Sequence, residues 1–261
     1  MLSEKKGLTN ALLAYNFVYQ SADRQESIMI SDKINFDPTK LALMKIHDWH
    51  TGPYPARVRI ALAEKNLQSR VQFVSVNLYK GEHKKAAFLA KNYSGTLPVL
   101  ELDDGTFIAE CTAITEYLDA LDGSTILTGK TPREKGVIHM MSKRAELELL
   151  DAISVYFHHA TPGLGPDVEI YQNAEWGFRQ RDKALRGMHY FDAVLQKQPF
   201  IAGEFFSMAD ITVIGGLIFA EIVKLPVPAE CLALLAWYAR MEERPSVKNR
   251  VTMSEPNQAS V

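Results

Sequence analysis

The spacing of apolar residues changes in character along the chain. In the first half, residues 45–49 and 71–76 show the short runs and alternation of strands, and between them Val58, Ala61 and Leu62 recur at helical spacing. Prolines at positions 53 and 55 preset the first turn of that helix. A loop and Ala-rich helix at 81–92, strands at 99–102 and 107–108, and a helix at 111–121 complete the series. The pattern predicts a βαβαββα domain.

Beyond a polar, turn-rich connection, apolar residues keep to the 3.6-residue spacing of helices. The expected helices cover 133–160, 172–197, 208–224 and 230–243, separated by breaks that contain Pro and Gly. We therefore predict a thioredoxin-like α/β N-terminal domain at 44–122, a linker at 123–132 and an all-α C-terminal domain at 133–250. Residues 1–43 are expected to be an extension, disordered or weakly packed, and 251–261 a tail.

Composition excludes several classes of function. Apolar residues make up 47% of the 261-residue chain, enough for a full core, and the formal net charge of −2 comes with no long run of either sign. Neither a nucleic acid nor an anionic membrane is indicated as a partner. Cys111 and Cys231 are too few for a disulfide framework and lack metal-ligand spacing, which favours a reducing, cytoplasmic setting. The apolar run at 11–19 is shorter than the roughly 20 residues of a membrane span.

The stretch at 95–114 carries the strongest chemical signal. Pro98 enters an apolar strand, where a proline removes a ladder donor, and a cis Leu97-Pro98 bond would let the backbone of Leu97 face a ligand. Glu110 and Cys111 then stand at the start of a helix, where a carboxylate lies beside free backbone N–H groups. This combination indicates small-peptide binding. The alternative is an ordinary strand, Asp-Gly turn, strand and helix with no ligand.

Ser207 and Asp210 precede the apolar run of the 208–224 helix. Their spacing resembles a capping box, with Asp210 at the third helical position in place of the commoner Glu. We interpret the pair as structural, against the alternative that Asp210 is a catalytic carboxylate.

Three motifs, at 52–62, 81–85 and 156–163, carry a family resemblance. Residues 44–250 as a whole resemble soluble glutathione transferases, and within that family the motifs are most similar to the fungal glutathione transferase II group. The resemblance implies a thioredoxin-like domain followed by an all-helical one, usually in a homodimer. It also implies conjugation of glutathione to hydrophobic electrophiles in detoxification, with glutathione as co-substrate and with no cofactor or metal.

Matched residue by residue, the resemblance assigns glutathione contacts. Leu97, beside a cis Pro98, would pair by its backbone with the cysteinyl part of glutathione. Glu110 would hold the γ-glutamyl ammonium, and the backbone N–H of Cys111 the γ-glutamyl carboxylate. Most relatives have Ser where this chain has Cys111, whose thiol is a weaker hydrogen-bond donor, so affinity is expected to depend on the backbone.

His83 and Lys84 match the family positions that meet the glycyl carboxylate, in a loop after Gly81 that is expected to be mobile. From the residues alone, a solvated basic loop with Lys85 as its third member is the favoured interpretation. The resemblance reverses that preference, and His83 and Lys84 are expected to bind the carboxylate.

The residue that usually supports the glutathione thiolate is missing. Relatives that use Ser place it five residues before the Arg that matches Arg57, and here that position is Gly52. A loop shift could bring the hydroxyl of Thr51 or Tyr54 near. Tyr54 is expected rather to pack its ring over the ligand or into the domain interface, and Tyr54 and Pro55 are candidate glutathione contacts.

A further donor to the thiolate is needed on energetic grounds. Lowering a thiol pKa from about 8.5 to about 6.5 needs roughly 2.7 kcal/mol. The helix N-terminus near Pro55 supplies typically 0.3 to 1 and at most about 2 kcal/mol, and one charged hydrogen bond supplies about 1.5 to 3 kcal/mol.

Ser154 and His158 are candidates because they stand at i and i+4 on the first long helix of the second domain, which lines the cleft in this fold. We predict that they accept the thiol proton and stabilise the thiolate, directly or through a water that they hold. His159, on a different face, is the weaker candidate. The structural alternative has Ser154 bonded back to the Leu150 carbonyl and His158 simply interfacial.

Two other functions compete with this prediction. A glutathione-dependent thiol transferase on the same fold needs a nucleophilic Cys at the first helix turn, and none lies between Trp49 and Arg57. A non-catalytic interaction module is favoured by the empty position at Gly52. Glu110, His83 and Lys84 argue against a module, because a scaffold needs no counter-charges for a zwitterion. We therefore predict an enzyme.

Overall fold

The structure, a computed structural model, describes residues 43–252. The extension expected at 1–43 therefore lies outside the described residues except for Leu43, and the tail at 251–261 lies outside them except for its first two residues.

A four-stranded mixed sheet forms the first part of the described chain. Its strands are β1 (Met44–Asp48), β2 (Val71–Ser75), β3 (Val99–Glu101) and β4 (Phe107–Ala109), in the order β2-β1-β3-β4. β1 pairs in parallel with β2, as the connecting helix requires, and antiparallel with β3, which pairs antiparallel with β4 across the Asp-Gly turn. All four predicted strands are thereby confirmed.

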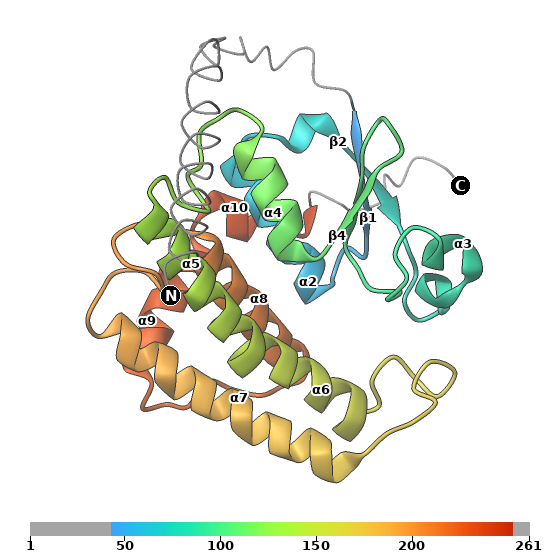
Figure 1. The fold of residues 1–261 in the computed structure, drawn as a ribbon. Coiled ribbons are helices and arrows are strands. Elements are labelled where there is room, and N and C mark those ends of the chain that lie inside the picture. Colours follow the sequence, from blue (N-terminus) through green and yellow to red (C-terminus); the bar gives the residue numbers. More distant parts are fainter. Residues whose placement is uncertain (1–42, 253–261) are drawn as a thin grey trace, which may run out of the picture. The chain divides into compact units, whose positions relative to one another are not determined.

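Helices cover both faces of this sheet. α2 (Pro53–Glu64) and α4 (Cys111–Ala120) lie on one face, and the short α3 (Ala86–Leu89) lies on the other (Figure 1). Two 3₁₀ turns, Gln68–Arg70 and Glu82–Lys84, precede β2 and α3. The arrangement is that of a thioredoxin-like domain, as predicted.

The second part of the described chain is helical. It comprises α5 (Pro132–Ala145), a π-helical turn at Glu146–Leu150, α6 (Asp151–Ala160), α7 (Ala174–Leu195), α8 (Met208–Ile222), α9 (Leu232–Glu242) and α10 (Pro245–Lys248). The segment at 133–160 is therefore not one regular α-helix as its apolar spacing suggested, because a π-helical turn divides α5 from α6. Such turns carry i→i+5 hydrogen bonds and are often found at functional sites.

Helix α8 forms the centre of the helical part. Residues 208–220 are all buried, and Ser207 and Asp210 form the predicted capping box at its start. The buried carboxylate of Asp210 accepts hydrogen bonds from the backbone N–H groups of Ile201 and Ser207 at 2.9 Å each and from the Ser207 hydroxyl at 3.0 Å. With these partners Asp210 is structural, as interpreted from the sequence.

Helix α2 packs between the sheet and α8, so it is buried on all sides, including its two arginines. Arg57 donates to Glu146 of the π-helical turn at 3.1 Å and to the Thr212 hydroxyl of α8 at 2.9 Å. Thr212 in turn lies 3.0 Å from the hydroxyl of Ser142. The buried Arg57 of the sheet domain is thus hydrogen-bonded to two elements of the helical part, the π-helical turn and α8.

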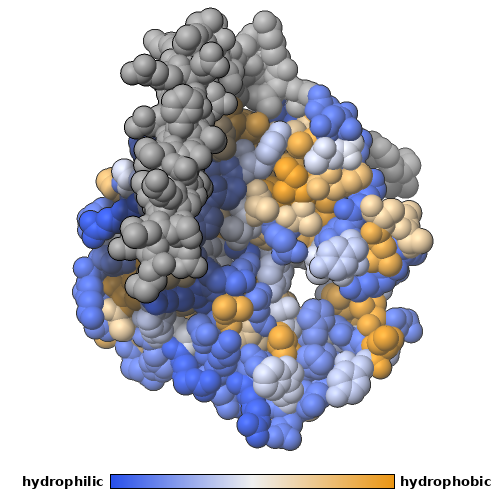
Figure 2. Space-filling model, viewed as in Figure 1, coloured by the Kyte–Doolittle hydropathy of each residue, from blue (hydrophilic) through white to orange (hydrophobic). Residues whose placement is uncertain are grey.

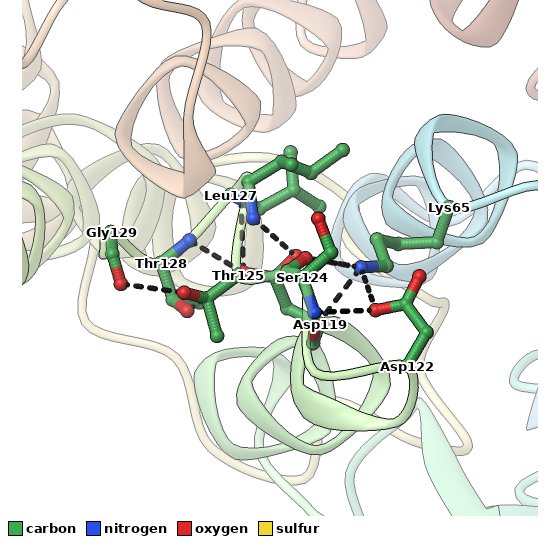
Figure 3. Close-up of polar contacts among 9 residues, drawn as sticks. Lys65, Asp119, Asp122, Ser124, Thr125, Leu127, Thr128 and Gly129 are labelled. Atoms are coloured by element: carbon green, nitrogen blue, oxygen red, sulfur yellow. Dashed lines mark hydrogen bonds and ion pairs between the residues drawn. The ribbon is translucent and has the colours of Figure 1, made fainter. Parts of the chain in front are cut away.

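The connection at 123–132 has the composition of a linker but is fixed by buried polar contacts (Figure 3). Lys65, at the end of α2, donates to the carbonyls of Asp119 and Ser124 and to the carboxylate of Asp122 at 2.6–3.0 Å. The carboxylate of Asp119 accepts hydrogen bonds from the backbone N–H groups of 126, 127 and 128 and from the Thr128 hydroxyl. The linker is therefore anchored along half its length.

The surface differs between the two parts. In the face shown in Figure 2, hydrophilic residues predominate over the helical part, and apolar residues gather beside the sheet. Of the helices described, none is both long and apolar enough to cross a lipid bilayer.

Candidate functional site

One cavity, of about 710 Å³, is lined by residues of the sheet domain on one side and of α6, α8 and the loop after α6 on the other. All ten site residues predicted from the sequence line it: Tyr54, Pro55, His83, Lys84, Leu97, Pro98, Glu110, Cys111, Ser154 and His158. The structure thus brings together residues that the sequence spreads over more than 100 positions. Cavities of 300–1,000 Å³ with a few convergent polar groups are typical of small-molecule sites.

The turn from β1 into α2 forms the floor of the cavity. Arg59 donates to both carboxylate oxygens of Asp48 at 2.7 Å and to the carbonyl of Gly52 at 3.4 Å, which holds the turn against the end of β1. Gly52 is the N-cap of α2. A Cβ at Gly52 would lie 2.9 Å from Cδ of Pro55 and 3.0 Å from the Trp49 carbonyl oxygen, so this turn is built for glycine.

The Leu97-Pro98 peptide bond is cis, as expected. The hydrogen-bonded ladder of β3 begins at Val99, so the backbone of Leu97 lies just outside the sheet. Leu97 is half-buried at the cavity wall and Pro98 is buried beneath it.

The start of α4 presents a carboxylate and backbone donors together. Glu110 is the exposed N-cap residue, with φ 69° and ψ 122°, a region that costs a non-glycine residue about 1 to 3 kcal/mol. Cys111 is buried, and its Sγ donates to the carbonyl of Tyr54 at 3.3 Å. Burial raises the pKa of the Cys111 thiol to about 11, so it is neither a thiolate nor directed to a ligand. The backbone N–H of Cys111 remains the group that this helix start offers.

His83 and Lys84 differ in exposure. Lys84 is exposed and donates to the carbonyls of Ser94 and Gly95 at 3.4 and 3.2 Å. His83 is buried and its Nδ1 has no hydrogen-bond partner, so it does not belong to a solvated basic loop. Burial lowers the pKa of His83, and the neighbouring Lys84 and His158 lower it further. Near neutral pH, His83 is therefore an uncharged donor beside a charged lysine.

Tyr54 connects the two sides of the cavity. Its hydroxyl donates to Oδ1 of Asp151, the first residue of α6, at 2.7 Å, and its ring meets Phe219 edge-on at 6.4 Å. Burial and the charge of Asp151 raise the pKa of Tyr54 well above its usual value. The hydroxyl is thus a protonated donor that already has an acceptor, and Tyr54 packs at the domain interface, one of the two placements expected. Thr51 is exposed at the edge of the cavity.

Ser154 and His158 both face the cavity from α6, as their spacing indicated, whereas His159 accepts from the Asn173 backbone on another side. His158 also has a partner that the sequence did not indicate. Its Nδ1 lies 2.7 Å from Oε1 of Glu169, in the loop after α6.

The helical side also carries a group of apolar residues. Its lining includes Leu164, Val168, Phe157, Ile218 and Phe219. The rings of Phe157 and Phe219 are tilted at 57° to each other, with 5.3 Å between their centroids. Among the residues that the structure describes, no group of His, Cys, Asp or Glu side chains could hold a metal ion.

Several polar residues at the cavity escaped the sequence reasoning, among them Glu146, Asp151 and Glu169. Asp151 and Glu146 interact with residues of α2 that are 97 and 89 positions away. Glu169 lies in an irregular loop without periodicity. The sequence of Glu146–Leu150 gave no sign of the π-helical turn, because its apolar spacing continues that of the flanking helices.

Comparisons with known proteins agree with this geometry. The sequence profile of the glutathione S-transferase N-terminal domain matches residues 51–121, and that of the C-terminal domain matches residues 146–245. The chain is 78% identical over 205 residues to glutathione S-transferase 2 of Saccharomyces cerevisiae, covering 78% of this chain and 88% of that protein.

Solved structures give the same result. The crystal structure of Gtt2 from S. cerevisiae has a TM-score of 0.79 and 77% identity, covering 79% of this chain and 99% of that one. A glutathione S-transferase domain-containing protein of Marinobacter aquaeolei has a TM-score of 0.75 and 51% identity, covering 78% and 99%. The chain is therefore a transferase enzyme that belongs to the glutathione S-transferase family.

Proposed function

We propose that this enzyme conjugates the thiolate of glutathione to hydrophobic electrophiles in detoxification. The observation that carries the proposal is the cavity itself, where donors and acceptors suited to a zwitterionic tripeptide line one side and apolar side chains line the other. Glutathione serves as co-substrate, and no other cofactor is needed for a nucleophilic displacement.

In the proposed binding mode, glutathione lies along the sheet domain. Glu110 binds the γ-glutamyl ammonium, and the N–H of Cys111 at the start of α4 binds the γ-glutamyl carboxylate. The backbone of Leu97 beside Pro98 pairs with the cysteinyl residue. His83 and Lys84 bind the glycyl carboxylate, His83 as an uncharged donor and Lys84 as a cation. Tyr54 and Pro55 contact the ligand at the start of α2.

The proposed chemistry occurs across the cavity. The N-terminus of α2 stabilises the thiolate in part, and Ser154 and His158 accept the thiol proton, directly or through a water that they hold. Two observations favour this pair over Tyr54: both side chains face the cavity, and the Tyr54 hydroxyl already donates to Asp151. The electrophile binds against Phe157, Phe219 and Leu164.

Two measurements test the proposal. Retention on a glutathione column followed by turnover of chloro-dinitrobenzene is expected; retention without turnover would indicate a non-catalytic module instead. Ultraviolet absorbance of the bound thiolate against pH should show a raised thiol pKa in Ser154→Ala and His158→Ala. An unchanged value in both variants contradicts the role of the pair, and a large rise in Tyr54→Phe assigns the role to Tyr54.

A homodimer in the cytoplasm is part of the same proposal. Met140 of α5 and Leu147 of the π-helical turn are 44% and 43% exposed and would offer neighbouring elements of the chain's apolar surface to a partner subunit. Both cysteines are free, which suits a reducing compartment. Light scattering should give twice the chain mass, and a charged residue at Met140 should weaken the dimer. A fluorescent fusion tests the location.

A further inference from the structure

Glu169 lies in the loop between α6 and α7 and reaches back to His158. Its Oε1 lies 2.7 Å from Nδ1 of His158 and accepts a hydrogen bond from the backbone N–H of Leu164 at 2.8 Å. The side chain of Glu169 is 10% exposed, whereas that of His158 is 38% exposed and lines the cavity. One carboxylate oxygen therefore contacts both the imidazole and the loop.

The loop is shaped so that this carboxylate fits. Gly163 has φ +57°, and a Cβ there would lie 2.3 Å from Oε1 of Glu169. The Gln172 side chain donates to the carbonyls of His158 and Thr161 at 2.8 Å each, which fastens the other end of the loop to α6. The contact between Glu169 and His158 thus depends on a glycine and on two further hydrogen bonds.

We propose that Glu169 is a positioning residue that acts through His158 in the transfer of the glutathione thiol proton. The inference rests on the proposed function of His158. A carboxylate at Nδ1 keeps a proton on that nitrogen and leaves the lone pair of the neutral ring on Nε2. Nε2 makes no hydrogen bond to any residue in the described part of the chain. It is therefore the nitrogen that can accept a proton from the cavity.

The step balances without a further reactant. The S–H bond of glutathione breaks and an N–H bond forms at Nε2, directly or through one water, which leaves a thiolate and an imidazolium. The carboxylate of Glu169 stabilises the imidazolium that forms beside it. After conjugation the proton passes from Nε2 to solvent. From across the cavity, His83 interacts electrostatically with both His158 and Glu169.

Glu169→Gln in the full chain tests the proposal. The amide oxygen of Gln can still accept from Leu164 and from Nδ1–H, so only the charge is removed. We expect the pKa of bound glutathione to rise by about one unit, which means about tenfold less thiolate at a pH below that pKa. The KM for glutathione should change less than about twofold, because Glu169 does not contact the peptide in the proposed binding mode.

Asp167→Asn is the matched control. It removes the same charge from the same loop, and Asp167 is exposed with no side-chain partner among the described residues. The thiol pKa should stay at the wild-type value in this variant. A rise equal to that of Glu169→Gln would mean that loop charge alone acts at a distance, which overturns a positioning role.

Gly163→Ala reaches the same carboxylate by a second route, since its methyl group would displace Glu169. It should raise the thiol pKa as Glu169→Gln does, with thermal unfolding recorded to confirm that the variant is folded. A wild-type thiol pKa in folded Glu169→Gln overturns the proposal.

His158→Ala separates this inference from the one on which it rests. If His158→Ala raises the thiol pKa and Glu169→Gln does not, the Glu169 proposal alone fails. If neither variant raises it, the role of His158 fails as well. The double variant should match His158→Ala; additive effects would show that Glu169 does not act through His158.

Discussion

The two sides of the cavity are constructed differently. The sheet side offers backbone groups at the ends of its elements: the Leu97 backbone beside Pro98, the start of α4 at Cys111, and Glu110 with its positive φ. The helical side offers side chains held by other side chains, such as His158 by Glu169. Backbone groups at the ends of helices and strands are fixed in position once the fold forms. A network of side chains, in contrast, keeps its geometry only when each of its members is present. We expect substitutions on the sheet side to change affinity and those on the helical side to change proton transfer.

The largest loss of stability is expected at Arg57, which is hydrogen-bonded from the sheet domain to the helical part. Arg57→Ala removes the donors to Glu146 and Thr212 and leaves a half-buried carboxylate with Lys143 as its remaining ionic partner. Breaking a buried pair from one side typically costs 3–5 kcal/mol, and about 3 kcal/mol is expected here because Lys143 stays. Urea unfolding measures the loss. Arg181→Ala, which breaks an exposed pair with Asp182, should cost less than about 0.5 kcal/mol, and equal losses would contradict the comparison.

The sheet side should show its own dependence on pH. Glu101 of β3 accepts hydrogen bonds from Lys45 and Lys91 and pairs with His47, and these contacts lower its pKa from 4.5 to about 2. Because the pKa is lowered in the folded state, the stability that Glu101 contributes is complete above about pH 4.5 and is lost as the pH falls to about 2.

Glu101→Gln measures that contribution. At pH 7 the variant should unfold with about 2 kcal/mol less free energy than wild type, a figure that allows for the exposure of Lys45. The difference should shrink steadily between pH 4.5 and pH 2 in acid titrations of unfolding. A difference that stays constant over this range would show that the pairing does not depend on the charge of Glu101.

Glu110 is the proposed counter-charge of the γ-glutamyl ammonium, so replacing it separates the affinity for glutathione from the rate of the chemical step. Glu110→Gln should raise the KM for glutathione about 10- to 30-fold, the loss of one charged hydrogen bond, and leave kcat at saturation within about twofold. Steady-state kinetics with both substrates provide the measurement. Glu116→Gln, on the same helix and paired with His139, is the control and should leave the KM unchanged. A fall in kcat rather than affinity would place Glu110 in the chemical step.

The smallest effect concerns the turn before α2. Gly52→Ser adds the hydroxyl that relatives of the Ser type carry, but its Cβ meets Pro55 and the Trp49 carbonyl, so about 1 kcal/mol of stability should be lost. No gain in bound thiolate is expected. Gly52→Ala adds side-chain volume without a hydroxyl group, so it separates the effect of the volume from the effect of the hydroxyl. Gly136→Ala, in the open interior of α5, should be neutral or slightly stabilising. More thiolate in Gly52→Ser would show that the turn can accommodate the serine.

The sequence predicted most of the sheet side because its signals are local. Pro98, the Asp-Gly turn and the Glu110-Cys111 helix start lie within one short stretch, and each restricts the backbone by itself. On the helical side only the shared face of Ser154 and His158 could be predicted, from their i, i+4 spacing. Glu169 and Asp151 could not, because their partners are set by loop geometry and by packing between distant segments. The burial of His83 was likewise hidden, since its flanking residues are polar.

The π-helical turn at Glu146–Leu150 sets the rotational phase of everything that follows it in α6. Each residue in an α-helix turns the next side chain by about 100°. Deleting one residue from this turn would restore an uninterrupted α-helix and rotate Asp151, Ser154 and His158 together by roughly that angle, away from α2 and the cavity. The position of the whole helical side of the site therefore depends on the residue count within a single turn.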